Sequence, residues 1–396
     1  MLTRKFLVLT FVVVAADFTF GGVYVQVLLD RGLSTGFIGT TLFGVLIASS
    51  FIEIPSGDWG DRFGQRRLTI LGLLSWGIGL VAFGLTDFVP ITVLALLLWS
   101  VGQALYSGAP ISLAINSIPT EDGDARQRLV KAANVTKWIG STAGGLLVLF
   151  GALQFNVEVA IVVAGAGMLL VALWVRLAWP ESERVEVDPS AGMFSRLRRN
   201  WSPQLWPLLL LFVVTSALLS LLLFAWQPLA VSVIHLPESF LGLALVVLTA
   251  VAAAGAAATR FESERLAKHN VDIWVLLALS GGFLAVADLS PWLAGAAILV
   301  SEFTISAALT LGASRAHAIF RDDSRNLLWS AFGWSSSIAM ALADLLLGWT
   351  WDDHALWLGL SSSVVVLAIA VAVVVVVASL RRVAAKQTDA ERNVGP

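Results

Sequence analysis

Residues 57–67 read Gly57-Asp58-Trp59-Gly60-Asp61-Arg62-Phe63-Gly64-Gln65-Arg66-Arg67, which places five charges and three glycines between two long apolar runs. Hydrophobic residues make up 58% of the chain and charged residues 13%. Such a balance leaves too little polar surface for a soluble globule. The stretch is therefore expected to be a loop between two spans of a polytopic membrane protein, and the fold class to be all-α.

Several other classes are excluded by composition. A net charge of -2 provides no basic face for nucleic acid, and the absence of cysteine removes thiolate sites. No lysine follows a glycine, so the chain has no Gly-Lys-Ser/Thr phosphate loop for ATP. We expect no enzyme active site, no cofactor and no metal. The histidines are too widely spaced to form a helical pair of metal ligands: His235, His269, His317 and His354.

The apolar runs are long enough to cross a bilayer repeatedly. A membrane span needs about 20 apolar residues. The first run follows Arg4-Lys5 and continues to about Leu29, so we interpret it as an uncleaved span rather than a signal peptide. Twelve spans are predicted, at 6–29, 36–56, 68–87, 90–113, 129–152, 157–179, 205–228, 237–258, 271–288, 291–313, 326–350 and 355–380.

The distribution of Lys and Arg predicts the orientation. Basic residues in short loops resist translocation. With a cytoplasmic N-terminus, the outer loops hold only Arg31, whereas acids such as Asp87 and Glu238 gather there. We therefore expect a multi-pass protein of the cell inner (plasma) membrane with both termini in the cytoplasm.

A polar break divides the chain into two halves of six spans. We expect a bundle over 1–179, a cytoplasmic linker over 180–204, a second bundle over 205–380 and a tail over 381–396. The second half repeats part of the charged loop, because Gly57-x-x-x-Asp61-Arg62 is matched by Gly255-x-x-x-Thr259-Arg260. Duplicated helical bundles are common in secondary transporters.

The charged loop resembles the signature of the major facilitator superfamily, Gly-x-x-x-Asp-Arg/Lys-x-Gly-Arg/Lys-Arg/Lys. The matching residues are Gly57, Asp61, Arg62, Gly64, Arg66 and Arg67, and Gln65 departs at one basic position. The resemblance implies two bundles around a central cavity that opens alternately to either side, with helices one, four, seven and ten lining it. It also implies that the cluster reaches the start of helix eleven, near Arg325, and closes an inner gate.

The chemistry of this loop supports a gate. Gly57 and Gly64 allow close helix approach and a sharp turn. A carboxylate such as Asp61 can lie at the positive end of a neighbouring helix. Glu53, four residues before Gly57, is assigned to the same inner-gate network. The alternative is a topology anchor only.

Ionisable residues inside spans are costly and therefore candidates for function. Asp17 near the centre of span one is the leading proton-carrying acid, with Lys137 of span five and Glu302 of span ten as further coupling residues. The alternative for Asp17 is a permanent ion pair with Lys137, and for Glu302 a bond to Thr304 or Ser306. Two alternatives are kept for Asp344: a bond to the serines at 335–337, or a bond to another helix.

Aromatic and amide side chains on the cavity helices are candidates for substrate contact, because an aromatic cavity with few polar groups suits amphipathic compounds. Tryptophans near the span ends are interpreted instead as interfacial belts. The cavity candidates are Tyr24, Trp99, Gln103, Tyr106, Trp226 and Gln227.

These observations predict a secondary transporter, most simply a proton-coupled antiporter that exports a small amphipathic drug-like or natural-product metabolite. Gly140-x-x-x-Gly144-Gly145 partly matches an exporter motif of the resembling family but lacks its proline. Proton-coupled uptake or lipid flipping by the same fold, and a non-transporting receptor, remain alternatives. The expected partners are a small-molecule substrate, protons and the lipid bilayer, and we expect a monomer.

Overall fold

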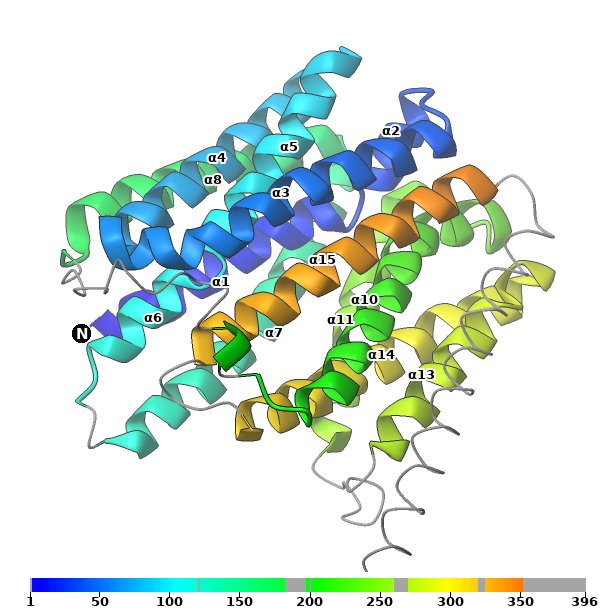
Figure 1. The fold of residues 1–396 in the computed structure, drawn as a ribbon. Helices are drawn as coiled ribbons and strands as arrows, with labels where there is room; N and C mark the ends of the chain where they lie inside the picture. Colours follow the sequence, from blue (N-terminus) through cyan, green and yellow to red (C-terminus); the bar gives the residue numbers. More distant parts are fainter. Residues whose placement is uncertain are drawn as a thin grey trace, which may run out of the picture.

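The computed structural model describes residues 2–119, 122–154, 156–181, 197–199, 201–259, 270–319 and 325–351. Inside helices in these ranges, the side chains of a few residues are also left out, among them Gly57, Asp61 and Arg62. The described part of the chain consists of helices and connections without strands, as the composition predicts (Figure 1).

The first group of helices runs from α1 to α8. Its members are α1 (Leu2–Gly21), α2 (Tyr24–Asp30), α3 (Thr35–Phe63), α4 (Gln65–Leu85), α5 (Val89–Tyr106), α6 (Ala109–Asn116), α7 (Gly123–Gln154) and α8 (Val157–Ala178). The pairs α1–α2 and α5–α6 each continue a single span across a short interruption.

The second group runs from α10 to α15. Its members are α10 (Leu205–Pro228), the π-helix η1 (Leu229–Val233), the 3₁₀ turn η2 (Glu238–Phe240), α11 (Leu241–Ala258), α13 (Val271–Leu284), the 3₁₀ turn η4 (Ala287–Leu289), α14 (Pro291–Ile319) and α15 (Arg325–Thr350).

Nine helices in the described ranges are long and apolar enough to cross a membrane. Two more correspond to predicted spans: α7 carries span five within a longer, partly charged helix, and α13 is a shorter apolar helix. The twelfth predicted span, 355–380, lies outside the described residues, as does most of the linker and all of the tail. The chain is thus a multi-pass membrane protein.

Two spans are interrupted at similar depths. The first breaks at Gly22 and Val23 between α1 and α2, where glycine lowers the cost of leaving helical geometry. The seventh changes form after Pro228, which lacks an N–H, and the chain continues as a π-helix in which the Ile234 N–H bonds the Leu229 carbonyl at 3.0 Å.

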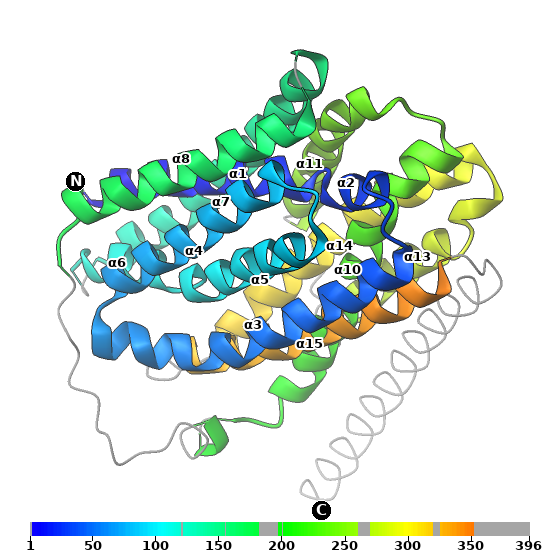
Figure 2. The ribbon, with the colours of Figure 1, turned by 90° about the horizontal axis from the view of Figure 1, so that it is seen from above.

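Connections lie at two faces of the molecule. We call the face at which α1 begins the N face and the other the opposite face. Near the opposite face the two groups meet along α3 and α15 and along α7 and α11; Figures 1 and 2 both show α3 and α15 side by side. Glycines allow these backbones to approach closely. If Gly348 had a Cβ, it would lie only 2.7 Å from the Gly39 Cα, and a Cβ on Gly242 would lie only 2.6 Å from the Gly145 carbonyl oxygen.

At the N face, the stretch 57–67 is not the loop that was expected: residues 57–63 end α3, residues 65–67 begin α4, and Gly64 alone joins the two helices. We keep the name charged loop for this stretch. Gly64 has φ +94°, and its carbonyl accepts the N–H groups of Arg67 and Leu68 at 3.1 and 3.3 Å. L side chains avoid this region of backbone space. The expected sharp turn of the charged loop is therefore located at Gly64.

Candidate functional site

Asp17 is the centre of the candidate site. It lies midway along the first span, one turn before the end of α1, and its Oδ1 accepts the Trp99 Nε1–H at 3.3 Å and the Gln103 Nε2–H at 3.1 Å. Trp99 and Gln103 are four residues apart on α5, so both side chains leave the same face of that helix. Both donors are neutral, and no described residue donates to Oδ2. The carboxyl group is therefore positioned by two fixed donors and keeps one oxygen available.

Aromatic rings cover the side of Asp17 that leads toward the opposite face. Phe20, one turn beyond Asp17, stacks on Tyr24 with ring centroids 5.2 Å apart and meets the edge of Trp99 at 5.2 Å. Tyr24 and Trp99 are themselves 5.9 Å apart. The rings of α1, α2 and α5 thus form one continuous aromatic cluster beside the carboxylate, in which Phe20 and Tyr24 are buried.

Two predicted cavity residues lie elsewhere. The Tyr106 ring packs on Trp76 of α4 at 5.8 Å, which makes it part of the α4–α5 contact. Trp226 is buried in α10, with 3% of its surface exposed, and none of the contacts described for it joins it to Asp17. The structure therefore brings three of the predicted aromatic and amide residues to Asp17: Tyr24, Trp99 and Gln103.

Gln227 connects the two helix groups. This side chain is fully buried at the end of α10, where its Oε1 accepts the Gln26 backbone N–H at 3.0 Å and its Nε2 donates to the Gly21 carbonyl at 3.1 Å. Both partners flank the break between α1 and α2, where the helical hydrogen-bond ladder is interrupted. Gln227 therefore links the two helix groups through hydrogen bonds and does not line an open part of the site.

Lys137 does not lie beside Asp17. Close packing of α7 on α1 occurs at Gly140, where a Cβ would lie 2.8 Å from the Phe11 carbonyl oxygen and 3.2 Å from the Val14 Cβ. Lys137 is three residues before Gly140, almost one turn closer to the N face, and is exposed. Asp17 is three residues after Val14, almost one turn closer to the opposite face. The two side chains therefore start from different depths. The polar contacts of Asp17 come instead from α5.

Glu302 is half-buried in the middle of α14. Its neighbours in sequence are engaged elsewhere, since the Ser301 hydroxyl donates to the Ser280 carbonyl and the Ser306 hydroxyl to the Ala252 carbonyl. Thr304 donates within its own helix. Neither of the two polar partners expected for Glu302 contacts it in the described part of the molecule.

Glu53 crosses between the groups. Its Oε2 accepts the Ser337 hydroxyl of α15 at 3.1 Å, and a Cβ on Gly333 would lie 2.8 Å from its Oε1. The carboxylate therefore occupies a space on α15 that is open because residue 333 is a glycine. Glu53 lies at the N-face end of the apolar part of α3.

The described arginines of the charged loop do not all point to one acid. Arg66 donates to the Arg176 carbonyl at the end of α8 and lies 3.7 Å from the Glu181 carboxylate. Lys5 donates to the Ala178 carbonyl, so two cations cap the C-terminal end of α8. Arg67 is exposed. The proposed gate contact of Asp61 and Arg62 with Arg325 rests on side chains outside the described part.

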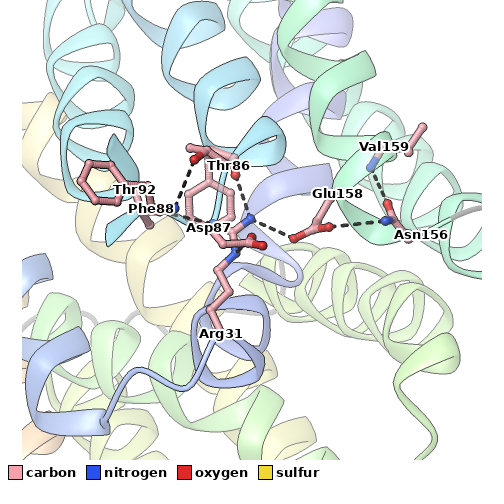
Figure 3. Close-up of polar contacts among 9 residues, drawn as sticks. Arg31, Thr86, Asp87, Phe88, Thr92, Asn156, Glu158 and Val159 are labelled. Carbon is pink, nitrogen blue, oxygen red and sulfur yellow. Dashed lines mark hydrogen bonds and ion pairs between the residues drawn. The ribbon is translucent and has the colours of Figure 1, made fainter. Parts of the chain in front are cut away.

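The single basic residue of the predicted outer loops, Arg31, has a buried side chain at the centre of a polar cluster whose acids reach the surface (Figure 3). Its side chain is 6% exposed and pairs with Asp87 at 3.1 Å and Glu158 at 2.9 Å. It also donates to the Phe83 carbonyl at 2.8 Å. Arg31 therefore ties the end of α2 to α4, to the α4–α5 connection and to the start of α8.

Sequence reasoning missed several of these residues. Phe20 is three residues from Asp17 and four from Tyr24, a helical spacing that could have placed it on the same face. The exceptional position of Arg31 among the outer loops was a signal for a special role. The partner of Asp344 proves to be Ser220 of α10, so the prediction of a bond to another helix is the correct one of the two alternatives.

The helical fold of the described part and its repeated apolar spans are those of a multi-pass membrane protein. The sequence profile of the Major Facilitator Superfamily matches residues 6–287. The chain belongs to this family.

Comparison with characterised proteins gives a further sequence relative. Multidrug resistance protein 2 of Bacillus subtilis (strain 168) is 33% identical over 119 residues. The match covers 28% of this chain and 30% of the length of that protein.

Solved transporters share the fold across most of the chain. A bacterial homologue of the human lysosomal transporter Spinster, solved inward-facing and unoccupied, has a TM-score of 0.70 at 19% identity, covering 88% of this chain and 81% of its own. A POT family transporter in complex with 5-aminolevulinic acid gives 0.77 at 12%, covering 93% and 96%. The nucleoside transporter NupG gives 0.73 at 14%, covering 93% and 98%.

Proposed function

We propose that this protein is a proton-coupled antiporter that exports a small amphipathic compound by alternating access. The observation that carries the proposal is the arrangement at Asp17, a membrane-embedded carboxyl group held by Trp99 and Gln103 beside an aromatic surface. The partial match to a multidrug resistance protein supports export over uptake.

The hydrogen bonds of Asp17 suit a group that gains and loses a proton. A permanent ion pair would keep the carboxylate charged, whereas neutral donors from an indole and an amide stabilise it in position in either state. The available Oδ2 can take a proton or face a positively charged substrate group. Proton and substrate would then compete for one carboxyl group, which is the requirement for exchange.

The aromatic surface suits the substrate class. Phe20, Tyr24 and Trp99 pack on one another beside Asp17 and carry few hydrogen-bonding groups, and we propose that they face the substrate when the helix groups part. Such walls favour amphipathic or hydrophobic compounds over sugars, which need many polar contacts. Glu302 and Lys137 remain proposed coupling residues on α14 and α7.

The two faces fit alternating access. The contacts of Gln227, and of Gly39 with Gly348, hold the helix groups together near the opposite face. We propose that the N face is cytoplasmic, that the protein lies in the inner membrane as a monomer, and that the charged loop closes the N face in the other half of the cycle, beside the Glu53–Ser337 contact that already joins the groups here. The proposed units are 1–179, 180–204, 205–380 and 381–396.

Transport in proteoliposomes tests the proposal, with a fluorescent amphipathic dye as the probe and an internal pH indicator as the second readout. Dye movement should drive protons in the opposite direction in the wild-type protein. Asp17→Asn should abolish the proton movement and leave the protein folded. Asp30→Asn is the matched control, because Asp30 is exposed on the same span and its amide can still accept the Gln26 side chain. Protons moving with the dye would contradict antiport.

A further inference from the structure

Asp344 is a second carboxyl group buried in the membrane-spanning part, and the proposed function does not use it. It lies on α15 with 5% of its surface exposed. The Ser220 hydroxyl of α10 is 2.5 Å from its Oδ1 and also 3.2 Å from the Met340 carbonyl oxygen. Three groups from two helices therefore form one short polar chain in an apolar environment.

The hydrogens in this chain can be counted. A serine hydroxyl carries one hydrogen and accepts through its lone pairs, whereas a carbonyl only accepts. If Asp344 is ionised, the one hydrogen of Ser220 must serve both the carboxylate and the Met340 carbonyl. If Asp344 is protonated, its O–H donates to Ser220, and Ser220 donates to Met340, so each contact has its own hydrogen. The second arrangement satisfies both observed distances.

Neighbouring charges agree with a neutral Asp344. In the described part, the helices that pack most closely on α15 are α3 and α10, and the sequence of α10 contains no charged residue. On α3, Glu53 faces Ser337, two turns of α15 from Asp344, and the charged residues beyond it, Asp58, Asp61 and Arg62, are further toward the N face. In the described part no cation contacts Asp344. A buried ionised carboxylate with a single hydroxyl partner would be costly.

The position of Asp344 links it to the closure of the opposite face. Its turn of α15 packs on α3, where a Cβ on Gly39 would meet the Asp344 carbonyl oxygen, and Gly348 lies one turn further along. On the other side, Tyr24 is within electrostatic reach of both Asp344 and Asp17. Separation of α3 from α15 would uncover Asp344 to water from the opposite face.

We infer that Asp344 and Ser220 form a second proton-binding site, in the helix group that lacks Asp17, and that the site holds its proton while α3 and α15 are packed together. The exchange of that proton with the solution at the opposite face, when α3 and α15 part, rests on the proposed alternating transport. That the site holds a proton while α3 and α15 are packed together does not depend on the proposed transport.

Infrared spectroscopy of the purified full-length protein tests the occupancy. A protonated carboxyl group has a C=O stretch that an ionised one lacks. The difference spectrum between wild type and Asp344→Asn at neutral pH should show this band. Ser220→Ala should move the band, because the carboxyl O–H loses its acceptor. Ser216→Ala, one turn along α10 and equally buried, should leave it in place.

A difference spectrum without a protonated-carboxyl band would overturn the inference, and so would a band that Ser220→Ala leaves unchanged. Size-exclusion elution of each variant verifies that it is folded. The result is independent of the dye assay, because the band is measured without transport. Failure of proton exchange in proteoliposomes with the band intact would therefore count against the proposed function alone.

Discussion

Gly64 shows how one residue of the charged loop is fixed by geometry. It is the only residue between α3 and α4, is buried, and has φ +94°. A side chain at this position would have to adopt a left-handed backbone or unwind the start of α4.

Gly64→Ala should destabilise the protein by about 1 to 2 kcal/mol, the cost of a left-handed conformation for a residue with a Cβ. Thermal unfolding in detergent should show a lower midpoint. Gly167→Ala on α8 is the control, because a Cβ there meets nothing within 4 Å and alanine favours a helix. An unchanged midpoint for Gly64→Ala would show that the loop relaxes without strain.

The depth of Asp17 could be predicted from sequence, but its partners could not. Counting residues along an apolar run gives the depth of a side chain in the membrane. The partner depends on the rotation of α1 against α5 and α7, which is set by packing at Gly140 and Gly144. Trp99 and Gln103 were expected at the cavity, yet Lys137 was considered as the ion partner, because the sequence contains no measure of that rotation.

At the scale of helices, the contact of α3 with α15 is made by backbone. Gly39 and Gly348 face each other so closely that a Cβ on Gly39 would lie 2.8 Å from the Gly348 Cα. Trp349 adds a neutral hydrogen bond from its Nε1 to the Thr40 hydroxyl at 2.9 Å. The two helices can separate there without breaking an ion pair.

Gly39→Ala should push α3 and α15 apart near the opposite face. Overpacking of this kind costs about 1 to 3 kcal/mol, enough to shift a two-state population about tenfold. Because the chain has no cysteine, spin labels can be attached at Phe37→Cys and Leu346→Cys, which are exposed on the two helices, and their distance distribution should lengthen. Gly44→Ala on the same helix meets open space and should change nothing. If the labelled parent protein and its Gly39→Ala and Gly44→Ala variants all gave the same distances, the expected separation of α3 from α15 would be wrong.

Helix existence was predictable and helix interruption was not. The predicted span 6–29 treats the first helix as continuous, whereas the structure breaks it after Gly21. The predicted span 205–228 agrees with α10, but the sequence did not predict that the chain continues beyond Pro228 as a π-helix. Hydropathy averages over a window and does not register the loss of one or two backbone hydrogen bonds. The two interruptions matter because Gln227 bonds the broken segment of the first span.

On the scale of the whole molecule, Gln227 holds the two helix groups together through two hydrogen bonds. Gln227→Leu should weaken this closure by about 2 kcal/mol, at about 1 kcal/mol for each bond. Spin labels at Phe88→Cys and Leu289→Cys, exposed at the opposite face on different groups, should then report longer distances.

The control for this prediction is Gln26→Leu. Gln26 takes part through its backbone N–H, and its own side chain donates to Asp30 within α2. Loss of that side chain therefore leaves the contact with Gln227 in place. If both variants gave the same distances, the closure would not depend on the Gln227 side chain.

The family and the membrane class followed from the charged loop and the composition, because both are properties of the sequence itself. The way in which the two helix groups pair could not be predicted from these properties. It depends on glycines that are far apart in sequence, such as Gly145 and Gly242, and many glycines in the chain have no such role. Gly21, Gly44 and Gly167, for instance, would admit a Cβ freely.

The contact between the helix groups near the opposite face has a consequence for the response to salt. The described contacts there are neutral: Gln227 with the Gly21 carbonyl, Gly39 with Gly348, and Trp349 with Thr40. Dissolved ions screen exposed charges over about 10 Å at 0.1 M and leave neutral contacts almost unaffected. Salt should therefore leave these contacts almost unchanged and act at this face mainly on Asp30 and Glu238, two acids of different helix groups that lie within electrostatic reach of each other.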